Sequence, residues 1–535
     1  MIVAAHPMAS EAGRDILRAG GSAVDAAIAA QMVLNLVEPQ SSGIGGGAFL
    51  MHFREADRKI EAYDGRETAP EKIRPEVFIR SNGKRRAFQD VGTGGTAVGV
   101  PGLIQMLYLA HRDHGNLPWA RLFDPAIQLA EKGFKVSRRL NKMIRRAKDM
   151  RDFPAARAYF YTPSGNPLPV GHRLRNPPLA DTLRLIASKG PDAFYAGAIS
   201  KDIAVTVKSA VHNPAVMTQA DIARYKAKKR TPVCIVYRDK RVCGMPPPTS
   251  GGITVLQILG LLKPFKMSQI QPGSVEAVHL ISEASRLAYA DRAQYIGDPD
   301  FVLVPVRGML NSSYLRRRSK QINSAGSMGK AMPGLPPSSE HMRLAPDARE
   351  GFPSTSHLSV IDADGNAVSM TSSIARAFGS RLLVRGFLLN NQLSDFAYSP
   401  RRNGRSVANA VAPRKRPRSS MSPKLVLNQD GQLFAIVGSP GGSRIIAYVA
   451  KTLIGLIDWK LGMQAAIDLP THTNRNGWTE LEKGTQLVKY VDALRGLGHN
   501  VRIRTLTSGL HGIRVTPRGY DGGADRRREG IALGD

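Results

Sequence analysis

Cysteine is nearly absent from this chain, at two of its 535 residues. So low a number excludes the dense disulfide framework of a small secreted domain, and the spacing matches no zinc-binding motif. Long apolar runs are also missing, since none reaches the about 18 residues of a membrane-spanning helix. The first residues lack the charged segment and apolar core of a signal peptide, so we expect none within this chain. The length allows two to four domains with a large core.

The two cysteines lie close together, Cys234 and Cys243, in a stretch of alternating character. A turn at Arg238-Asp239 would place them opposite each other on paired strands. Such a pair is either a cross-strand disulfide in an oxidising compartment or two buried thiols, and we expect the thiols.

Metal-ligating patterns are equally scarce. His111 and His114 lie one helical turn apart, but no third ligand accompanies them in the sequence. We therefore expect a surface pair and no metal site.

Acidic residues are outnumbered by basic ones, 43 to 75, which gives a net charge of +32. The basic runs are scattered, and no aromatic residues are interleaved with them as in nucleic-acid-binding surfaces. We expect solvated surface that attracts anionic molecules non-specifically, and no nucleic-acid partner.

One hairpin organises the functional prediction. It begins after a Pro- and Gly-rich tract and turns at Asp364-Gly365. With a three-residue loop and a left-handed Gly365, one face is apolar and the other polar, whereas a two-residue turn would mix the faces. The apolar pairs are Leu358–Met370 and Val360–Val368, and the polar pairs are Thr355–Ser373, His357–Thr371 and Ser359–Ser369. Taken alone, such a polar face is ordinarily solvated surface.

The position of Thr355 suggests more. Residues 319–353 are rich in Ser, Gly and Pro, and a long tract of this kind is either functional or disordered. A flexible tract before Thr355 would let a new chain end move away if the chain cuts itself between Ser354 and Thr355. The freed threonine would be a nucleophile, with its own α-amine (reference pKa about 7.7 to 8.0) as the base.

Two glycine-rich segments differ in their expected roles. The segment 41–47 follows a helix and leads into a strand, the reverse of the order that cradles a phosphate, so we expect close backbone packing there. Gly441-Gly442 lies between a strand and a helix, where bare N–H groups can form an oxyanion hole. A turn at 64–70 presents Arg66, which is suited to a bidentate grip on a carboxylate.

Together these motifs resemble the γ-glutamyltranspeptidase family of N-terminal nucleophile hydrolases, including its acylase-like members. The resemblance spans nearly the whole chain, and it is carried by segments 38–49, 65–70, 245–252, 290–299, 355–379, 388–396 and 416–444. It implies an α+β fold, a four-layer αββα sandwich, built as one unit from a large subunit (1–354) and a small subunit (355–535). It implies no cofactor and no metal.

The resemblance also implies a role for each matched residue. Thr355 would be the nucleophile, and its supporting hydroxyls would be Thr371 and Ser373. Gly441 and Gly442 would form the oxyanion hole. The substrate α-carboxylate would be held by Arg66, Ser419 and Ser420, and the α-amine by Gln392 and Asp395.

Two positions depart from the family pattern. Ala375 stands where members commonly have Asn, or Glu in acylase-like members, and loss of one substrate hydrogen bond costs roughly 0.5–1.5 kcal/mol. The loop 397–408 is short and basic, so the lid of some members is expected to be missing. An open site would favour hydrolysis and bulkier leaving groups.

Three functions remain open. The first is a self-processing hydrolase or transferase of γ-glutamyl amides such as glutathione, which passes the acyl group to water, an amino acid or a peptide. The second is an acylase for glutaryl or cephalosporin-type amides, and the third is an inactive homologue that serves as a binding protein. The family points to a periplasmic or secreted protein if a signal peptide is missing from this chain, and to a cytoplasmic one if the chain starts as written.

Overall fold

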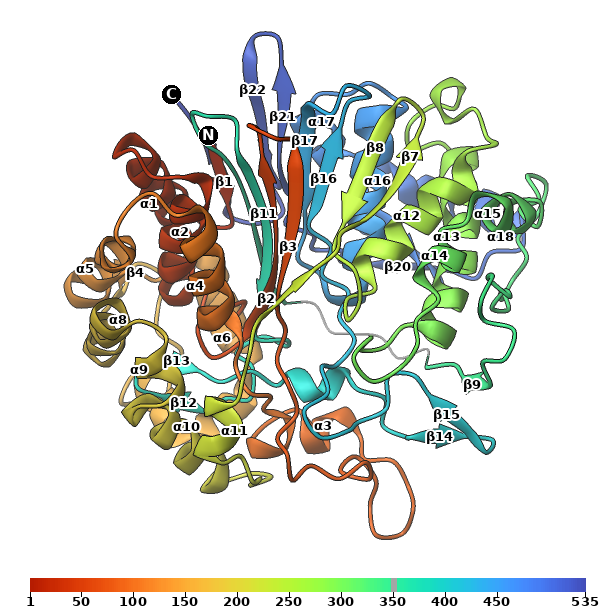
Figure 1. The fold of residues 1–535 in the computed structure, drawn as a ribbon. Helices are drawn as coiled ribbons and strands as arrows, with labels where there is room; N and C mark the ends of the chain where they lie inside the picture. The colour runs from red at the N-terminus through yellow and green to blue at the C-terminus, as the bar shows by residue number, and fades with distance from the viewer. Residues whose placement is uncertain (348–353) are drawn as a thin grey trace.

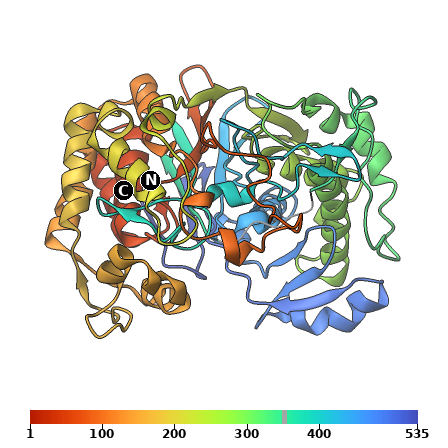
Figure 2. The ribbon, with the colours of Figure 1, turned by 90° about the horizontal axis from the view of Figure 1, so that it is seen from below.

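The computed structural model describes residues 1–347 and 354–535. Two antiparallel sheets lie face to face at the centre, and helices cover the outer face of each (Figure 1). Seen from below, helices from the first 225 residues flank one sheet, and helices from residue 251 onward flank the other (Figure 2). The predicted α+β class and four-layer αββα sandwich are confirmed.

Every neighbouring pair of strands in the two sheets is antiparallel. The first sheet has the order β23 (Ile531–Leu533), β1 (Ile2–Ala4), β10 (Ser356–Ile361), β11 (Ala367–Ser373), β2 (Gly47–Arg54), β3 (Lys59–Gly65) and β6 (Lys228–Arg230). The second has the order β22 (Gly519–Ala524), β21 (His511–Thr516), β17 (Leu433–Gly438), β16 (Lys424–Leu427), β8 (Lys240–Gly244) and β7 (Val233–Tyr237).

The helices divide between the two outer layers by their place in the chain. Those from the first 225 residues are α1 (Pro7–Arg18), α2 (Ala23–Val37), α3 (Phe88–Val91), α4 (Leu103–His114), α5 (Asp124–Lys132), α6 (Arg138–Arg146), α7 (Pro154–Phe160), α8 (Pro177–Lys189), α9 (Asp192–Tyr195), α10 (Ala198–Lys208) and α11 (Gln219–Ala223). Those from residue 251 onward are α12 (Gly251–Leu262), α13 (Val275–Tyr295), α14 (Val306–Met309), α15 (Ser312–Ser319), α16 (Ile445–Ile457), α17 (Met463–Asp468) and α18 (Val491–Gly496).

Smaller strands complete the fold: β4 (Phe134–Lys135), β5 (Arg173–Leu174), β9 (Leu344–Ala345), β12 (Leu383–Val384), β13 (Phe387–Leu388), β14 (Arg401–Arg402), β15 (Arg405–Val407), β18 (His472–Asn474), β19 (Thr479–Glu482) and β20 (Val501–Arg504). Such short segments carry little of the periodicity from which strands are predicted in a sequence. None of the helices in the described residues has the length and apolar character needed to cross a bilayer.

Helix α2 shows how the layers are held. Ser22 Oγ accepts from the Asp25 N–H at 3.2 Å, and the Asp25 carboxylate accepts from the Ser22 N–H at 2.9 Å, which is a capping box. Every residue of the helix is buried, as its all-round apolar sequence predicts. It packs against α1 on one side and against β10 and β11 on the other.

The β10–β11 hairpin has the predicted register, with Leu358 opposite Met370 and His357 opposite Thr371. The polar face of the hairpin is buried, so the ordinary case of a solvated surface does not apply to it. His357 and Thr371 are both at most 1% exposed because this face packs against the second sheet. Their polar atoms satisfy each other, with 2.8 Å between His357 Nδ1 and Thr371 Oγ1.

Cys234 and Cys243 lie opposite each other on β7 and β8, as the predicted turn requires. They form a disulfide, so the expectation of paired thiols is wrong. Their Cα atoms are 4.1 Å apart on adjacent strands, which brings the two sulfur atoms within bonding reach.

The part of the tract 319–353 that the structure describes is irregular, but it is held in place. Glu283 on α13 accepts from the Met328 N–H at 2.7 Å, and Asp291 on the same helix accepts from the Gly334 N–H at 2.8 Å. The expected flexibility therefore does not extend to these residues, because buried carboxylates bind their backbone. Residues 348–353, directly before Ser354, lie outside the described part of the chain.

The basic loop 397–408 also has structure. It contains the hairpin β14–β15, and β15 pairs in parallel with β9. This hairpin lies beyond the ends of the two central sheets, beside β9 (Figure 1).

Candidate active site

A cavity of about 290 Å³ lies where the hairpin, the turn at Arg66 and the start of α16 meet. Residues from segments hundreds of positions apart line it, and most of the predicted site residues are among them. The predicted lining residues are Arg66, Thr355, Ser373, Gln392, Asp395, Ser419, Ser420 and Gly442.

Thr355 stands at the wall of this cavity, directly before β10. Its Oγ1 lies 3.0 Å from Ser373 Oγ, and Ser373 Oγ accepts from the Ala375 N–H at 2.9 Å. The side chain of Thr355 is 3% exposed. Its hydroxyl therefore faces the cavity with a fixed hydrogen-bond partner, as the hairpin register predicts.

The backbone at Thr355 is strained. Its φ of +113° is outside the regions that a β-branched residue adopts readily. Neighbouring contacts hold it there: Ser354 Oγ donates to the Gln40 carbonyl at 2.7 Å, and Arg528 Nη1 donates to the Thr355 carbonyl at 3.0 Å. Strain of this kind costs about 1–3 kcal/mol and persists only where the surroundings enforce it.

Two other predicted catalytic residues stand apart from the lining. Thr371 hydrogen-bonds to His357 between the sheets, two residues further along β11 from the cavity than Ser373. Gly441 lies directly before the lining residue Gly442, at the junction of β17 and α16. Both glycines have positive φ, +139° and +61°, so this turn favours residues without a Cβ.

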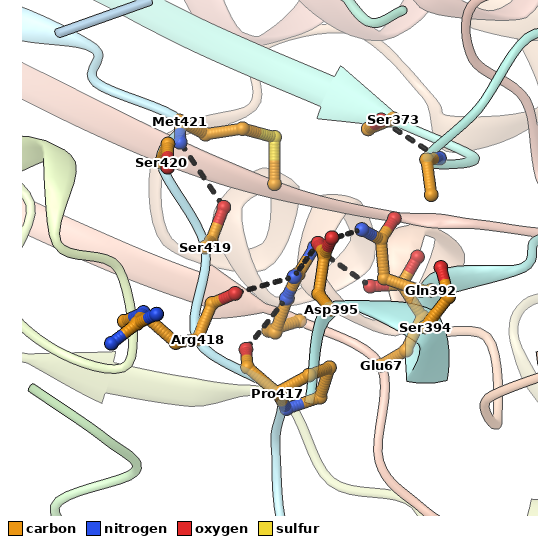
Figure 3. A network of polar contacts seen from close by, with 12 residues as sticks. Glu67, Ser373, Gln392, Ser394, Asp395, Pro417, Arg418, Ser419, Ser420 and Met421 are labelled. Carbon is orange, nitrogen blue, oxygen red and sulfur yellow. Dashed lines mark hydrogen bonds and ion pairs between the residues drawn. The ribbon is translucent and has the colours of Figure 1, made fainter. Parts of the chain in front are cut away.

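Arg66 and Asp395 form an ion pair inside the cavity. Arg66 Nη2 lies 2.7 Å from Asp395 Oδ2, and Gln392 Nε2 donates to the same oxygen at 2.6 Å. Arg66 Nε also donates to the Pro417 carbonyl at 3.0 Å. Figure 3 shows Asp395 and Gln392 pointing toward each other, beside the segment from Pro417 to Met421. The two charged groups predicted to grip a substrate are thus paired with each other.

Ser419 and Ser420 belong to this neighbouring segment. Ser419 Oγ accepts from the Met421 N–H at 3.1 Å, and Arg292 Nη2 donates to Ser420 Oγ at 2.9 Å. The segment 245–252 supports them, because Ser250 Oγ donates to the Ser419 carbonyl at 2.6 Å.

Glu67 lies beside the ion pair and was not predicted as a site residue. Its carboxylate is fully buried, 3.6 Å from Arg66 Nη1, and neither oxygen has a hydrogen-bond partner among the described residues. Burial, opposed in part by Arg66, raises the pKa of Glu67 to about 7.

A family model described as "Gamma-glutamyltranspeptidase" matches residues 9–535. The chain belongs to this γ-glutamyltranspeptidase family. Among its relatives is a glutathione hydrolase proenzyme from Bacillus subtilis (strain 168), 37% identical over the whole chain and 91% of the relative. An acylase ACY 1 proenzyme from Pseudomonas sp. (strain SE83) is 35% identical over 98% of this chain and 91% of its own length.

Among solved structures, a cephalosporin acylase from Bacillus halodurans is similar to this chain. It superposes with a TM-score of 0.87 at 28% identity and covers 99% of this chain and 95% of its own. The N-terminal nucleophile hydrolase fold that the sequence resemblance implies is therefore confirmed.

In this member of the γ-glutamyltranspeptidase family, the cavity is also lined by arginines that the sequence alone does not place there. Arg85, Arg86 and Arg376 line it, and the Arg376 guanidinium lies 4.7 Å from the centre of the Phe88 ring. Arg528 belongs to the basic run Arg526-Arg527-Arg528, which the sequence alone predicts to be solvated, yet it donates to the Thr355 carbonyl. No local pattern distinguishes such arginines from surface ones, because their partners are remote in sequence.

The raised pKa of Glu67 gives a pH prediction. As the pH rises through about 7, Glu67 ionises next to Arg66 and would compete for it with the donor carboxylate that Arg66 is predicted to bind. The KM for a γ-glutamyl donor should therefore rise several-fold between pH 6 and 8, and Glu67→Gln should flatten this rise. Steady-state kinetics measures the KM at each pH, with a variant of an exposed glutamate, Glu131→Gln, as the control. An identical KM profile in wild type and Glu67→Gln would refute this role.

Proposed function

We propose that the chain is a self-processing amide hydrolase and acyltransferase that cleaves γ-glutamyl amides such as glutathione. One observation carries the proposal: the Thr355 hydroxyl and the Arg66–Asp395 ion pair line the same cavity. The Thr355 hydroxyl is a nucleophile held by Ser373. Arg66 offers a positive charge to the α-carboxylate of a γ-glutamyl group, and Asp395 offers a negative charge to its α-ammonium. The relatives named glutathione hydrolase support this reading.

Processing would come first. The Thr355 hydroxyl adds to the Ser354 carbonyl, the Ser354–Thr355 C–N bond breaks, and the nitrogen takes up a proton. Water then hydrolyses the resulting ester, which leaves a carboxylate on Ser354 and a free α-amine on Thr355. The strained φ of Thr355 supports this step, because cutting the bond releases the constraint. The products are fragments 1–354 and 355–535.

Catalysis would then use the freed threonine. Its α-amine accepts the hydroxyl proton as the oxygen attacks the amide carbonyl of the donor. The N–H groups of Gly441 and Gly442 would stabilise the developing oxyanion. The leaving amine departs, and water or an acceptor amine releases the acyl group from Thr355.

Substrate binding would rearrange the ion pair. The donor carboxylate would bind Arg66 with Ser419 and Ser420, and the donor ammonium would bind Asp395 with Gln392. One internal ion pair is thereby exchanged for two intermolecular ones, so no buried charge is left without a partner. A donor with a carboxylate but no ammonium cannot make this exchange completely.

The second candidate is an acylase for glutaryl or cephalosporin-type amides. It is favoured by the acylase relatives. Ala375, which lines the cavity without a polar side chain, matches neither the Asn nor the Glu of the family and favours neither candidate. Asp395 favours the γ-glutamyl donor, because a glutaryl group has no ammonium to pair with it. An inactive binding protein is disfavoured because Thr355, Ser373 and Gly442 all line one cavity.

A donor comparison tests the proposal. The purified protein should release aniline from a γ-glutamyl anilide with a kcat/KM at least about tenfold above that for the matching glutaryl anilide. Intact-mass analysis of the same sample should show the two fragments. A preference for the glutaryl donor would support the acylase instead, and an uncut chain inert toward both would support the binding protein.

A further inference from the structure

A cluster of metal-ligating side chains lies on the helix-facing side of the first sheet. His52 on β2 and Glu61 on β3 are direct cross-strand partners, and His114 is the last residue of α4. One ligand atom from each lies within 4.8 Å of the other two. The sequence offered no third ligand for His114, because His52 and Glu61 reach it only through the fold. His111, its expected companion, instead contacts the Leu117 carbonyl at 2.8 Å.

His52 has no evident structural role among its neighbours. Its side chain is 3% exposed, yet Nδ1 has no hydrogen-bond partner among the described residues. Buried imidazoles are normally hydrogen-bonded, so an unpartnered one beside a carboxylate needs an explanation. A ligand that accepts its lone pair supplies one.

The donor atoms of the cluster suit a metal. Two imidazole nitrogens and one carboxylate oxygen are ligands that a divalent transition-metal ion accepts. Glu61 Oε2 lies 2.7 Å from His114 Nε2 and would supply the charged third ligand.

The rings must rearrange modestly. They are stacked with centroids 3.8 Å apart and planes inclined by 18°. Lone pairs in near-parallel planes do not converge on one ion, so one ring has to turn. No described hydrogen bond holds the His52 ring, whereas His114 Nε2 contacts both Glu61 and Tyr63. His52 is therefore the ring that can turn at little cost.

The site is reachable from solvent and compensated in charge. The side chains of Glu61 and Asp113 are 13% and 16% exposed, and Tyr63 OH donates to Asp113 at 2.9 Å. Lys229 Nζ lies 2.7 Å from Asp113 and 3.6 Å from the other oxygen of Glu61. A flexible lysine on the surface can swing away when a cation enters.

A second cluster, His279, Glu283 and His499, makes an informative contrast. His279 Nδ1 contacts His499 Nε2 at 2.7 Å, and His279 Nε2 contacts the Asn323 carbonyl at 2.7 Å. Its ring nitrogens and carboxylate are already occupied by protein partners, and Glu283 binds the irregular tract. This cluster is explained by structure alone, and the one at His52 is not.

We propose that His52, Glu61 and His114 bind one divalent transition-metal ion, with Zn²⁺ the best match to two imidazole nitrogens and one carboxylate. Five residues along β2 separate His52 from Gly47, the partner of Ser373, which is roughly 16 Å of strand. The ion would therefore tie α4 to β2 and β3 and stabilise the fold, and it would take no part in the reaction at Thr355.

Calorimetric titration of the untagged, chelator-treated full chain with ZnCl₂ tests the site. We expect one saturable equivalent in wild type and a rise in Tm on binding. His52→Phe keeps a ring over His114 but removes the nitrogens, and it should weaken affinity by at least about tenfold. The exposed His172→Ala should bind as wild type does.

Glu61→Gln provides an independent variant if His52→Phe does not fold, and it should show the same loss. Circular dichroism identifies the folded variants. Absence of saturable binding by wild type would overturn the proposal. Unchanged affinity in a folded His52→Phe or Glu61→Gln variant would overturn it as well.

Discussion

Thr355→Ala should yield one intact chain of 535 residues that has lost turnover of γ-glutamyl amides by roughly four orders of magnitude or more. The substitution removes the hydroxyl that would attack both the Ser354 carbonyl and the donor amide. Without the cut it also leaves the α-amine of residue 355 tied up in a peptide bond. Both losses arise from one oxygen atom, whose hydrogen-bond partner in the structure is Ser373 Oγ at 3.0 Å.

Intact-mass spectrometry and an anilide assay measure the two effects together. Thr355→Ser is the matched control, because it retains the hydroxyl and lacks only a methyl group. It should still be cut into 1–354 and 355–535 and should keep measurable activity. Normal cutting in Thr355→Ala would contradict the assignment, and so would cutting in wild type at any other bond.

Asp395→Asn should lower kcat/KM for a γ-glutamyl anilide by about 10²–10³-fold, since losing a buried charge pair costs roughly 3–4 kcal/mol. Asparagine keeps the shape of the side chain and can still hydrogen-bond, but it cannot neutralise the donor ammonium. For a glutaryl anilide, which has no ammonium, the rate should stay within about threefold or rise. Arg66 loses its internal partner in this variant and becomes more available to a carboxylate.

The ratio of the two donors in steady-state assays is the quantity to follow. The exposed Asp181→Asn on α8 controls for the loss of one negative charge elsewhere. Equal losses with both donors would mean that Asp395 acts only by holding Arg66 in place. An unchanged kcat/KM for the γ-glutamyl donor would refute the role of Asp395 in binding the donor.

The parts of the site that depend on local structure could be predicted from the sequence. The Asp364-Gly365 turn and strict alternation determine which residues of the hairpin share a face, so Thr355 opposite Ser373 follows without tertiary information. Gly441-Gly442 between a strand and a helix is equally local. The all-round apolar sequence of α2 likewise predicts its burial and its limits.

The remaining features depend on contacts between distant segments. Arg66 and Asp395 are 329 positions apart, and nothing near either one indicates that they pair. The polar face of the hairpin is buried because a second sheet covers it, which its own alternation cannot reveal. The tract before Ser354 has the composition of a loose segment, but inward-facing carboxylates on α13 bind its backbone over the described residues.

The order of strands in the first sheet has a consequence for the lifetime of the protein. The proposed small subunit contributes β23, β10 and β11. From the large subunit, β1 lies between β23 and β10, and β2, β3 and β6 continue the sheet beyond β11. Cutting before Thr355 leaves every one of these pairings in place, so the two pieces stay joined. Once unfolded, however, they can recover this interleaved sheet only by meeting again, a bimolecular step that depends on concentration. The uncut chain can therefore refold by itself, whereas the processed protein does not readily re-form after unfolding. The lifetime of the processed protein is then set by its unfolding rate.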